Sequence, residues 1–235
     1  PGVNMGGYWL RPSVANRVHD QLHVRAAVWS DGHNRAALVV LDLIALHRDR
    51  VEGLRRRITD SSGISPEAIL ICCTHTHSGP LTYPYRGMGT IDADYMSILA
   101  DRVAGCVETA CARLEAVTIS YARVPFQLGR NRRIFAGDNS EAPLVSHLHV
   151  LRMEGATGPI ASIFSHPCHP VVLGADNCAI SADFPGAAVR YLEGQSGTPA
   201  IFVNGACGDV NPRITNGTFD DARELGGLLG QAVER

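Results

Sequence analysis

A buried strand that runs directly into a histidine-rich loop decides the fold: Ala68-Ile69-Leu70-Ile71-Cys72-Cys73 is followed at once by Thr74-His75-Thr76-His77-Ser78-Gly79-Pro80. Residues two apart on a strand point to the same side, so we expect His75 and His77 to face one cleft, with Ser78 and Gly79 turning the chain away. Imidazole is a common metal ligand, and ligands usually bind at strand ends in α/β proteins. This pattern predicts a metal site, although an isolated histidine pair has a structural role about equally often.

The residues before this strand predict a parallel strand-helix-strand unit. Residues 23–29 and 36–46 are expected to form a β-hairpin whose second strand is apolar, central and buried. A helix over residues 49–61 then leads to the strand at 68–73, and this length suits a right-handed parallel crossover. Asp42 interrupts the apolar strand, and a buried carboxylate needs a partner. It is a candidate for the floor of the site, with a structural cap as the equal alternative.

The rest of the chain continues the alternation of strands and helices. Apolar patterning predicts strands near 117–124, 144–153, 159–164 and 199–204, and helices near 94–114, 184–192 and 220–234. We therefore predict an α/β fold in which mixed parallel and antiparallel β-sheets are layered between helices. We expect residues 1–235 to form a single catalytic domain that is incomplete at both ends.

Composition excludes several functional classes. The formal net charge is -2 and the pI is about 6.6, so there is no electrostatic case for a nucleic-acid partner or an anionic membrane. No run of eighteen apolar residues predicts a transmembrane segment. All 21 cationic residues are arginine, which excludes a catalytic or phosphate-binding lysine within this sequence.

The seven cysteines resemble small buried hydrophobic residues more than a disulfide framework. Their odd number favours a reducing compartment, and we expect a cytoplasmic protein. The opening Pro1-Gly2 looks like the middle of a turn, so the sequence does not exclude a signal peptide that has been removed.

A second histidine cluster, Phe164-Ser165-His166-Pro167-Cys168-His169-Pro170, also follows an apolar run. Its two prolines are incompatible with a helix interior or a central strand, so we expect an irregular loop that carries both histidines. No Cys-x-x-Cys pair accompanies the histidines. This argues against a structural zinc knot and favours a catalytic site with an open coordination position.

Polar groups at four strand ends are expected to converge. They are His75 with His77, Arg132, His166 and His169 with Asp183 nearby, and Asp209 with Asn211. Zinc bound there would lower the pKa of water and polarise a carbonyl, while arginine or an amide steadies the oxyanion. The Arg132 guanidinium could alternatively hold a carboxylate, phosphate or polar headgroup.

Other chemistries fit the sequence less well. A metallo-β-lactamase site normally reads His-x-His-x-Asp-His, but Ser78, Gly79 and Pro80 follow His77 here. Amidohydrolase barrels need a longer chain and commonly a lysine ligand. A hydrolase that uses Cys168 is less favoured, because adjacent residues in a proline-bracketed loop rarely form the required thiol-imidazole hydrogen bond.

Five motifs in order along the chain resemble those of the neutral/alkaline non-lysosomal ceramidase family, in its N-terminal catalytic domain. They are Met5-Gly6-Gly7-Tyr8, residues 74–80, Asn131-Arg132, the segment from Cys168-His169-Pro170 to Ile180-Ser181-Ala182-Asp183, and Gly208-Asp209-Val210-Asn211-Pro212. The resemblance implies β-sheets layered between helices and a zinc-dependent amide hydrolase. In that family two histidines, a glutamate and a tyrosine bind the zinc.

Carried onto this sequence, the resemblance implies that His75 and His169 bind one zinc ion and that His77 and Arg132 lie near the reaction centre. Two departures matter. Asn211 occupies the position of the family's catalytic serine, and an amide cannot form an acyl-enzyme. The family's glutamate and tyrosine ligands correspond to sequence beyond residue 235, so we expect an unseen C-terminal segment.

We therefore expect a bacterial-type, ceramidase-like zinc hydrolase that lacks the family serine. It would cleave an amide (N-acyl) or related acyl bond of a small N-acyl or lipid-like substrate through metal-activated water, with His77, Arg132 and Asn211 as catalytic residues. The alternative is a catalytically silent ceramidase-like protein that binds a ligand in the same cleft. The oligomeric state stays open.

Overall fold

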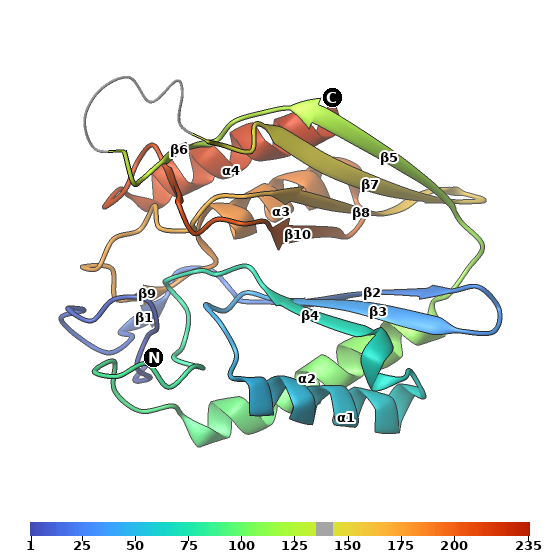
Figure 1. Cartoon of the computed structure of the whole chain (residues 1–235), viewed down its shortest axis with the longest axis horizontal. Helices are drawn as coiled ribbons and strands as arrows, with labels where there is room; N and C mark the ends of the chain where they lie inside the picture. Colours follow the sequence, from blue (N-terminus) through green and yellow to red (C-terminus); the bar gives the residue numbers. More distant parts are fainter. Residues whose placement is uncertain (135–142) are drawn as a thin grey trace.

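Two β-sheets stacked face to face, each covered on its outer side by helices, form the body of the protein (Figure 1). The computed structural model describes residues 1–134 and 143–235. The smaller sheet has the strand order β2 (Val24–Ser30), β3 (Arg35–Leu41), β4 (Ile69–Cys73), and the larger sheet has the order β10 (Ala200–Asn204), β8 (Gly158–His166), β7 (His147–Gly155), β5 (Thr118–Pro125). The predicted layered α/β fold with mixed sheets is confirmed.

The helices lie in pairs. The smaller sheet packs on α1 (Arg48–Ser62) and α2 (Ala93–Ala112), and the larger sheet packs on α3 (Asp183–Ser196) and α4 (Phe219–Glu234) (Figure 1). A short 3-10 turn, Pro66–Ala68, precedes β4. Two small ladders complete the fold: β1 (Arg17–Val18) pairs in parallel with β9 (Ala179–Ile180), and β6 (Gly129–Asn131) pairs antiparallel with β11 (Val210–Pro212).

The smaller sheet contains the parallel crossover that the sequence predicts, and the larger sheet contains a second one. Strands β3 and β4 are parallel with α1 between them, and β8 and β10 are parallel with α3 between them. The remaining pairs, β2 with β3, β7 with β8, and β5 with β7, are antiparallel. Because parallel strands end at the same sheet edge, the residues after β4, β8 and β10 start from corresponding edges of the two sheets.

Side-chain alternation along β3 explains the stacking. Ala37, Val39 and Leu41 pack against the helices, while Leu38 and Val40 pack between the sheets. Met153, Ile163 and Ile201 of the larger sheet complete this central layer. A strand buried on both faces needs a continuous apolar sequence, which is what residues 37–41 provide.

Local capping fixes the helix ends. The Asp92 side chain accepts a hydrogen bond from the Tyr95 amide at the start of α2, and Thr218 and Asp221 form a capping box at the start of α4. Helices α1 and α3 end at Gly63 and Gly197, whose positive φ angles of 71° and 67° favour glycine. Among the described residues, no helix combines the length and apolar character needed to cross a bilayer.

Three boundaries differ from the predicted ones. Strand β3 ends at Leu41, so Asp42 lies just beyond it. Strand β8 continues through His166, which we had expected in a loop, because β10 pairs along its length and aligns Asn204 with His166. The ladder stops there since Pro167 has no N–H to donate. The expected loops around 128–133 and 205–213 contain the short pair β6 and β11.

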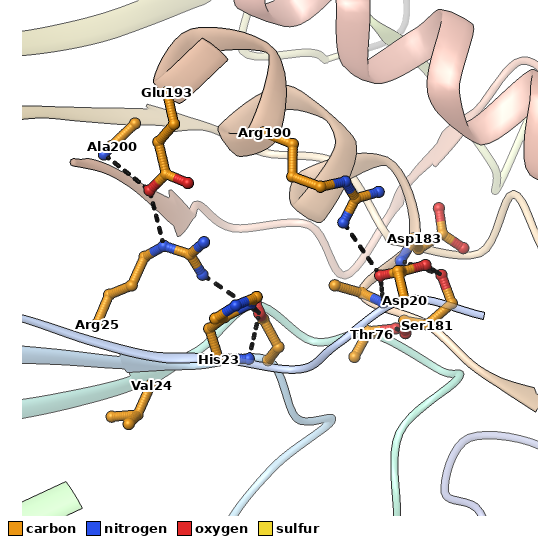
Figure 2. A network of polar contacts seen from close by, with 12 residues as sticks. Asp20, His23, Val24, Arg25, Thr76, Ser181, Asp183, Arg190, Glu193 and Ala200 are labelled. Atoms are coloured by element: carbon orange, nitrogen blue, oxygen red, sulfur yellow. Dashed lines mark hydrogen bonds and ion pairs between the residues drawn. The ribbon is translucent and has the colours of Figure 1, made fainter. Parts of the chain in front are cut away.

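Buried ion pairs join the smaller sheet to α3. Arg25 of β2 lies 3.5 Å from Asp42 and 3.5 Å from Glu193. Figure 2 shows the contact between Arg25 and Glu193 of α3. The Asp42 carboxylate also accepts the His23 backbone N–H at 2.9 Å. Burial raises the pKa of Asp42, and the Arg25 charge opposes that rise. Of the two readings left open for Asp42, these contacts support the structural one.

A second network of hydrogen bonds, centred on Asp20, lies at the N-terminus of α3. Asp20 accepts hydrogen bonds from the Ser181 hydroxyl at 2.5 Å, the Ala182 amide at 2.9 Å and Arg190 at 3.2 Å (Figure 2). Asp183 begins α3, and its carboxylate accepts the amide protons of Leu173 and Phe184. Every carboxylate in this part of the molecule has partners within the protein.

Candidate metal centre

Two histidines meet at the edge of the stacked sheets. His75 lies two residues after β4, and His169 lies three residues after β8. Their Nε2 atoms are 3.3 Å apart, although the residues are 94 positions apart in the sequence. The approach that we expected of these two imidazoles is confirmed, while their binding of a metal stays a prediction.

Backbone carbonyls fix the tautomer of each ring. The Nδ1 atom of His75 lies 2.7 Å from the Ile44 carbonyl oxygen, and that of His169 lies 2.5 Å from the Cys207 carbonyl oxygen. A carbonyl oxygen only accepts hydrogen bonds, so each Nδ1 carries the proton and each Nε2 carries a lone pair. Two imidazole lone pairs therefore point at one another across 3.3 Å.

That arrangement fits a metal ion. Two facing lone pairs repel one another unless a cation or proton lies between them. Nitrogen atoms about 2.0 to 2.1 Å from a tetrahedral zinc ion are about 3.3 to 3.4 Å apart, which matches the observed separation. Carbonyl acceptors on the second ring nitrogen are also the usual support of metal-binding histidines.

An unusual backbone conformation orients His75. Its φ angle is 73°, in the left-handed region, and its amide donates to the Leu43 carbonyl at 2.9 Å. Strand alternation, from which we expected His75 and His77 to face the same side, is therefore the wrong reason, because β4 ends at Cys73. The two rings are nevertheless neighbours, with centroids 5.1 Å apart.

Asn204 holds both histidine-bearing loops together. Its side-chain amide donates to the Thr74 carbonyl at 3.0 Å and to the Cys168 carbonyl at 3.1 Å, and its Oδ1 accepts the Cys168 amide proton. Thr74 and Cys168 are the residues directly before His75 and His169. The sequence predicts Asn204 only as the end of a strand, and its positioning role depends on the pairing of β10 with β8.

Cys207 supplies a third donor that the sequence analysis missed. His75, His169 and Cys207 each offer one possible ligand atom, a ring nitrogen or the thiol sulfur, and these three atoms lie within 4.8 Å of one another. Burial raises the pKa of the Cys207 thiol, and the Arg132 charge opposes the rise. The sequence signal was the loop Gly205-Ala206-Cys207-Gly208, which follows a strand end like the two histidine loops.

His77 lies beside this cluster. Its ring centroid is 5.6 Å from that of His169 and 5.1 Å from that of Tyr8, and neither ring nitrogen has a hydrogen-bond partner in the described structure. Burial lowers the pKa of His77 to about 3, and the neighbouring histidines add to that effect. Gly7 packs so closely that a Cβ there would lie 2.6 Å from the ring, which requires glycine.

His166 does not join the cluster. Its Nδ1 contacts the His147 carbonyl at 3.0 Å, and its Nε2 accepts the Leu128 amide proton at 3.3 Å. Both ring nitrogens are therefore used to hold neighbouring segments. The expected convergence of His166 is wrong because it remains in β8, and Asp183, the first residue of α3, is likewise outside the three-donor group.

Arg132 and Asn211 come from the β6–β11 ladder. The Arg132 amide donates to the Asp209 carbonyl at 2.7 Å, and its side chain is exposed. Burial lowers the pKa of His169, and the Arg132 charge contributes to that shift. The Oδ1 atom of Asn211 is buried and has no hydrogen-bond partner among the described residues. The Arg132 side chain is thus accessible to a ligand, while the catalytic roles of both residues stay predictions.

Cys168 is unsuited to nucleophilic chemistry. It is buried in the apolar core between the larger sheet and α3, and burial strongly raises the pKa of its thiol. Its sulfur contacts the His169 carbonyl at 3.9 Å instead of an imidazole nitrogen. These contacts argue against the Cys168-dependent hydrolase.

Two surface grooves lie away from this cluster. One of about 450 Å³ runs between residues 124–128 and α4, and one of about 300 Å³ lies between Asp20 and α4. None of the three donor residues lines either groove. The candidate site is therefore defined by its donor atoms rather than by cavity size.

Comparisons with known proteins match nearly the whole chain. Neutral ceramidase A of Dictyostelium discoideum is 26% identical over 255 residues, which covers 95% of this chain and 36% of that protein. Neutral ceramidase of Mycobacterium tuberculosis is 26% identical over 244 residues, covering 89% and 38%. The Pseudomonas aeruginosa enzyme is 24% identical, covering 95% and 38%. The chain thus spans less than half the length of these relatives.

Solved structures share the fold. The crystal structure of neutral ceramidase from Pseudomonas aeruginosa matches with a TM-score of 0.86 at 23% identity, covering 99% of this chain and 42% of that one. A ceramidase complexed with C2 matches with a TM-score of 0.88 at 22% identity, covering 99% and 41%. No protein-family model matches the chain. Over nearly all its length the chain is therefore similar to several neutral ceramidases and shares their fold.

Proposed function

We propose that the protein hydrolyses an amide (N-acyl) bond of a small lipid-like substrate at a zinc centre built on His75 and His169. The observation that carries the proposal is the pair of Nε2 lone pairs that face each other at 3.3 Å. The names of the curated relatives, all neutral ceramidases, supply the reaction class. A zinc ion bound there would polarise the substrate carbonyl and activate water.

The surrounding residues have separate tasks. His77 lies next to His75 and His169, with ring centroids 5.1 Å and 5.6 Å away, so its imidazole is placed to hydrogen-bond a substrate amide or a water molecule at the centre. The exposed guanidinium of Arg132 is suited to a polar headgroup or to the negative charge that develops on the carbonyl oxygen. Both are fixed through the backbone, His77 by Arg11, which donates to its carbonyl at 2.6 Å, and Arg132 by Asp209.

Asn211 defines the kind of attack. Its amide cannot form an acyl-enzyme, so water attacks the carbonyl directly. The atom without a partner is Oδ1, which accepts hydrogen bonds. This supports a role in orienting a water or a substrate N–H more than donation to an oxyanion.

Elemental analysis and turnover test the proposal together. The purified protein should contain zinc, release fatty acid from a panel of N-acyl compounds, lose this activity to a chelator and regain it with zinc. Asn211→Ala should lower turnover but leave measurable activity, because the activated water and not the amide is the nucleophile. Arg130→Ala, at the β6 position paired with Asn211, is the matched control and should retain turnover.

Two outcomes would contradict the proposal. Full zinc occupancy without hydrolysis of any N-acyl compound would identify a silent ligand-binding protein. A trapped acyl-enzyme from the unmodified protein would overturn direct attack by water.

A further inference from the structure

The thiol of Cys207 is the group at this centre to which the proposed function gives no task. We propose that Cys207 binds the metal as a thiolate, so that this chain contributes two imidazoles and one sulfur. The inference rests on the proposed function only for the presence of a metal between His75 and His169. It does not depend on which substrate is cleaved.

The backbone of Cys207 is held beside the metal position. Its carbonyl accepts both the His169 Nδ1 proton at 2.5 Å and the Val210 amide proton at 3.0 Å. The same residue therefore sets the tautomer of one ligand and carries a donor atom within 4.8 Å of both histidines. Ligand atoms of one zinc ion, each about 2.0 to 2.3 Å from the metal, lie within this range of one another.

The other cysteines have different surroundings. Cys178 and Cys106 donate to backbone carbonyls, each at 3.7 Å, and Cys168 lies in the apolar core. Cys111 packs with the apolar residues between α1, α2 and the smaller sheet. Within residues 1–134 and 143–235, Cys207 is the cysteine that groups with two histidines.

A thiolate changes which ions the centre prefers. Cysteine sulfur and imidazole nitrogen select zinc and related ions over magnesium or calcium, which need oxygen ligands. As the sulfur-metal bond forms, the thiol loses its proton to solvent, so metal binding releases a proton. The sulfur also places a negative charge on a centre that the two neutral imidazoles leave without one.

Cobalt substitution tests the sulfur ligand directly. Cobalt-loaded protein should have the near-ultraviolet charge-transfer absorption of a cobalt-thiolate bond. Cys207→Ser should lose this absorption and bind the metal about 10 to 100-fold more weakly, since the imidazoles remain. Cys111→Ser is the matched control and should retain both the absorption and the affinity. An unchanged spectrum in Cys207→Ser would overturn the inference.

Thiol protection gives a second readout that needs no variant. Zinc should slow the alkylation of Cys207 by iodoacetamide, mapped by mass spectrometry, and leave the half-buried Cys72 unaffected. Equal alkylation of Cys207 with and without zinc would overturn the inference even if Cys207→Ser failed to fold. If Cys207 binds the metal but no N-acyl compound is hydrolysed, only the proposed function is refuted. If N-acyl compounds are hydrolysed but zinc does not slow the alkylation of Cys207, only this inference is refuted.

Discussion

Two groups of polar side chains satisfy their polar atoms in opposite ways. One is the donor cluster of His75, His169 and Cys207, and the other is the carboxylate network of Asp20, Asp42, Arg25, Arg190 and Glu193. In the carboxylate network each acceptor meets a donor of the protein, as Figure 2 shows for Asp20 with Arg190 and Ser181. In the donor cluster two acceptors face each other instead. A buried polar group costs free energy unless it is paired.

The difference separates scaffold from site. In the carboxylate network the carboxylates are paired without a ligand, and Arg25 joins the smaller sheet to α3. The donor cluster, in contrast, is stabilised when a cation or a proton lies between its two lone pairs, and a metal ion fits that position. The same comparison extends to the second histidine motif: His166 uses both ring nitrogens within the protein, whereas His169 uses one.

The largest effect is expected from removing one ligand. His75→Asn keeps a residue that tolerates the positive φ angle of 73°, and it should weaken zinc binding more than about 100-fold. His166→Asn is the matched control, which should lower thermal stability and leave zinc affinity unchanged. Calorimetric titration measures both. Equal loss of zinc affinity in the two variants would remove the distinction between these histidines.

A change in the carboxylate network should lower the stability of the fold and leave zinc affinity unchanged. Arg25→Met leaves the Asp42 carboxylate, whose side chain is only 5% exposed, without its cationic partner. The free energy of unfolding should fall by about 3 kcal/mol, since breaking a buried pair costs about 3 to 5 kcal/mol and some charge compensation by His23 remains. Urea denaturation measures this loss. A simultaneous loss of zinc affinity would show that the network belongs to the site.

Much of the fold could be predicted because local signals agreed with it. The apolar run of β3, the helix over α1 and the spacing to β4 predict a parallel unit, and the structure contains it. The end of β8 could not be predicted, because it depends on how far β10 pairs. That pairing is a long-range interaction, and it places His166 in the sheet and His169 in the loop.

The site was predicted in part, and for a partly wrong reason. The motif and the family resemblance indicated His75 and His169, but strand alternation does not orient His75. Its left-handed backbone is fixed by a hydrogen bond to Leu43, which no local pattern of residues encodes. Cys207 and Asn204 were missed because their roles exist only once the loops after β4, β8 and β10 lie together.

A smaller effect on zinc affinity is expected from changing Asn204, which connects the loops that carry His75 and His169. Asn204→Leu removes the hydrogen bonds to the Thr74 and Cys168 carbonyls while keeping a similar side-chain volume. Both histidines should then move relative to each other, and zinc affinity should fall about 10-fold, as for other residues that orient ligands. Asn177→Leu removes an amide that bonds Ser78 and Ala179, outside the donor cluster, and serves as the control. Equal zinc affinity in Asn204→Leu and the unmodified protein would contradict the positioning role.

The smallest effect concerns the pH dependence of the scaffold. Burial raises the pKa of Asp183 to about 7, and the nearby Asp20 carboxylate adds to that rise. Between pH 4 and 7 the folded protein therefore keeps a proton that the unfolded chain releases, so the free energy of unfolding should fall as the pH rises through this range. Asp183→Asn keeps an oxygen acceptor for the Leu173 and Phe184 amides and tolerates the positive φ of 55°, but it cannot ionise. Its unfolding free energy, measured in urea at several pH values, should decline less between pH 4 and 7 than that of the unmodified protein, while zinc affinity stays unchanged. Parallel pH profiles for the two proteins would mean that Asp183 is already ionised in the folded state across this range, and the raised pKa would then be wrong.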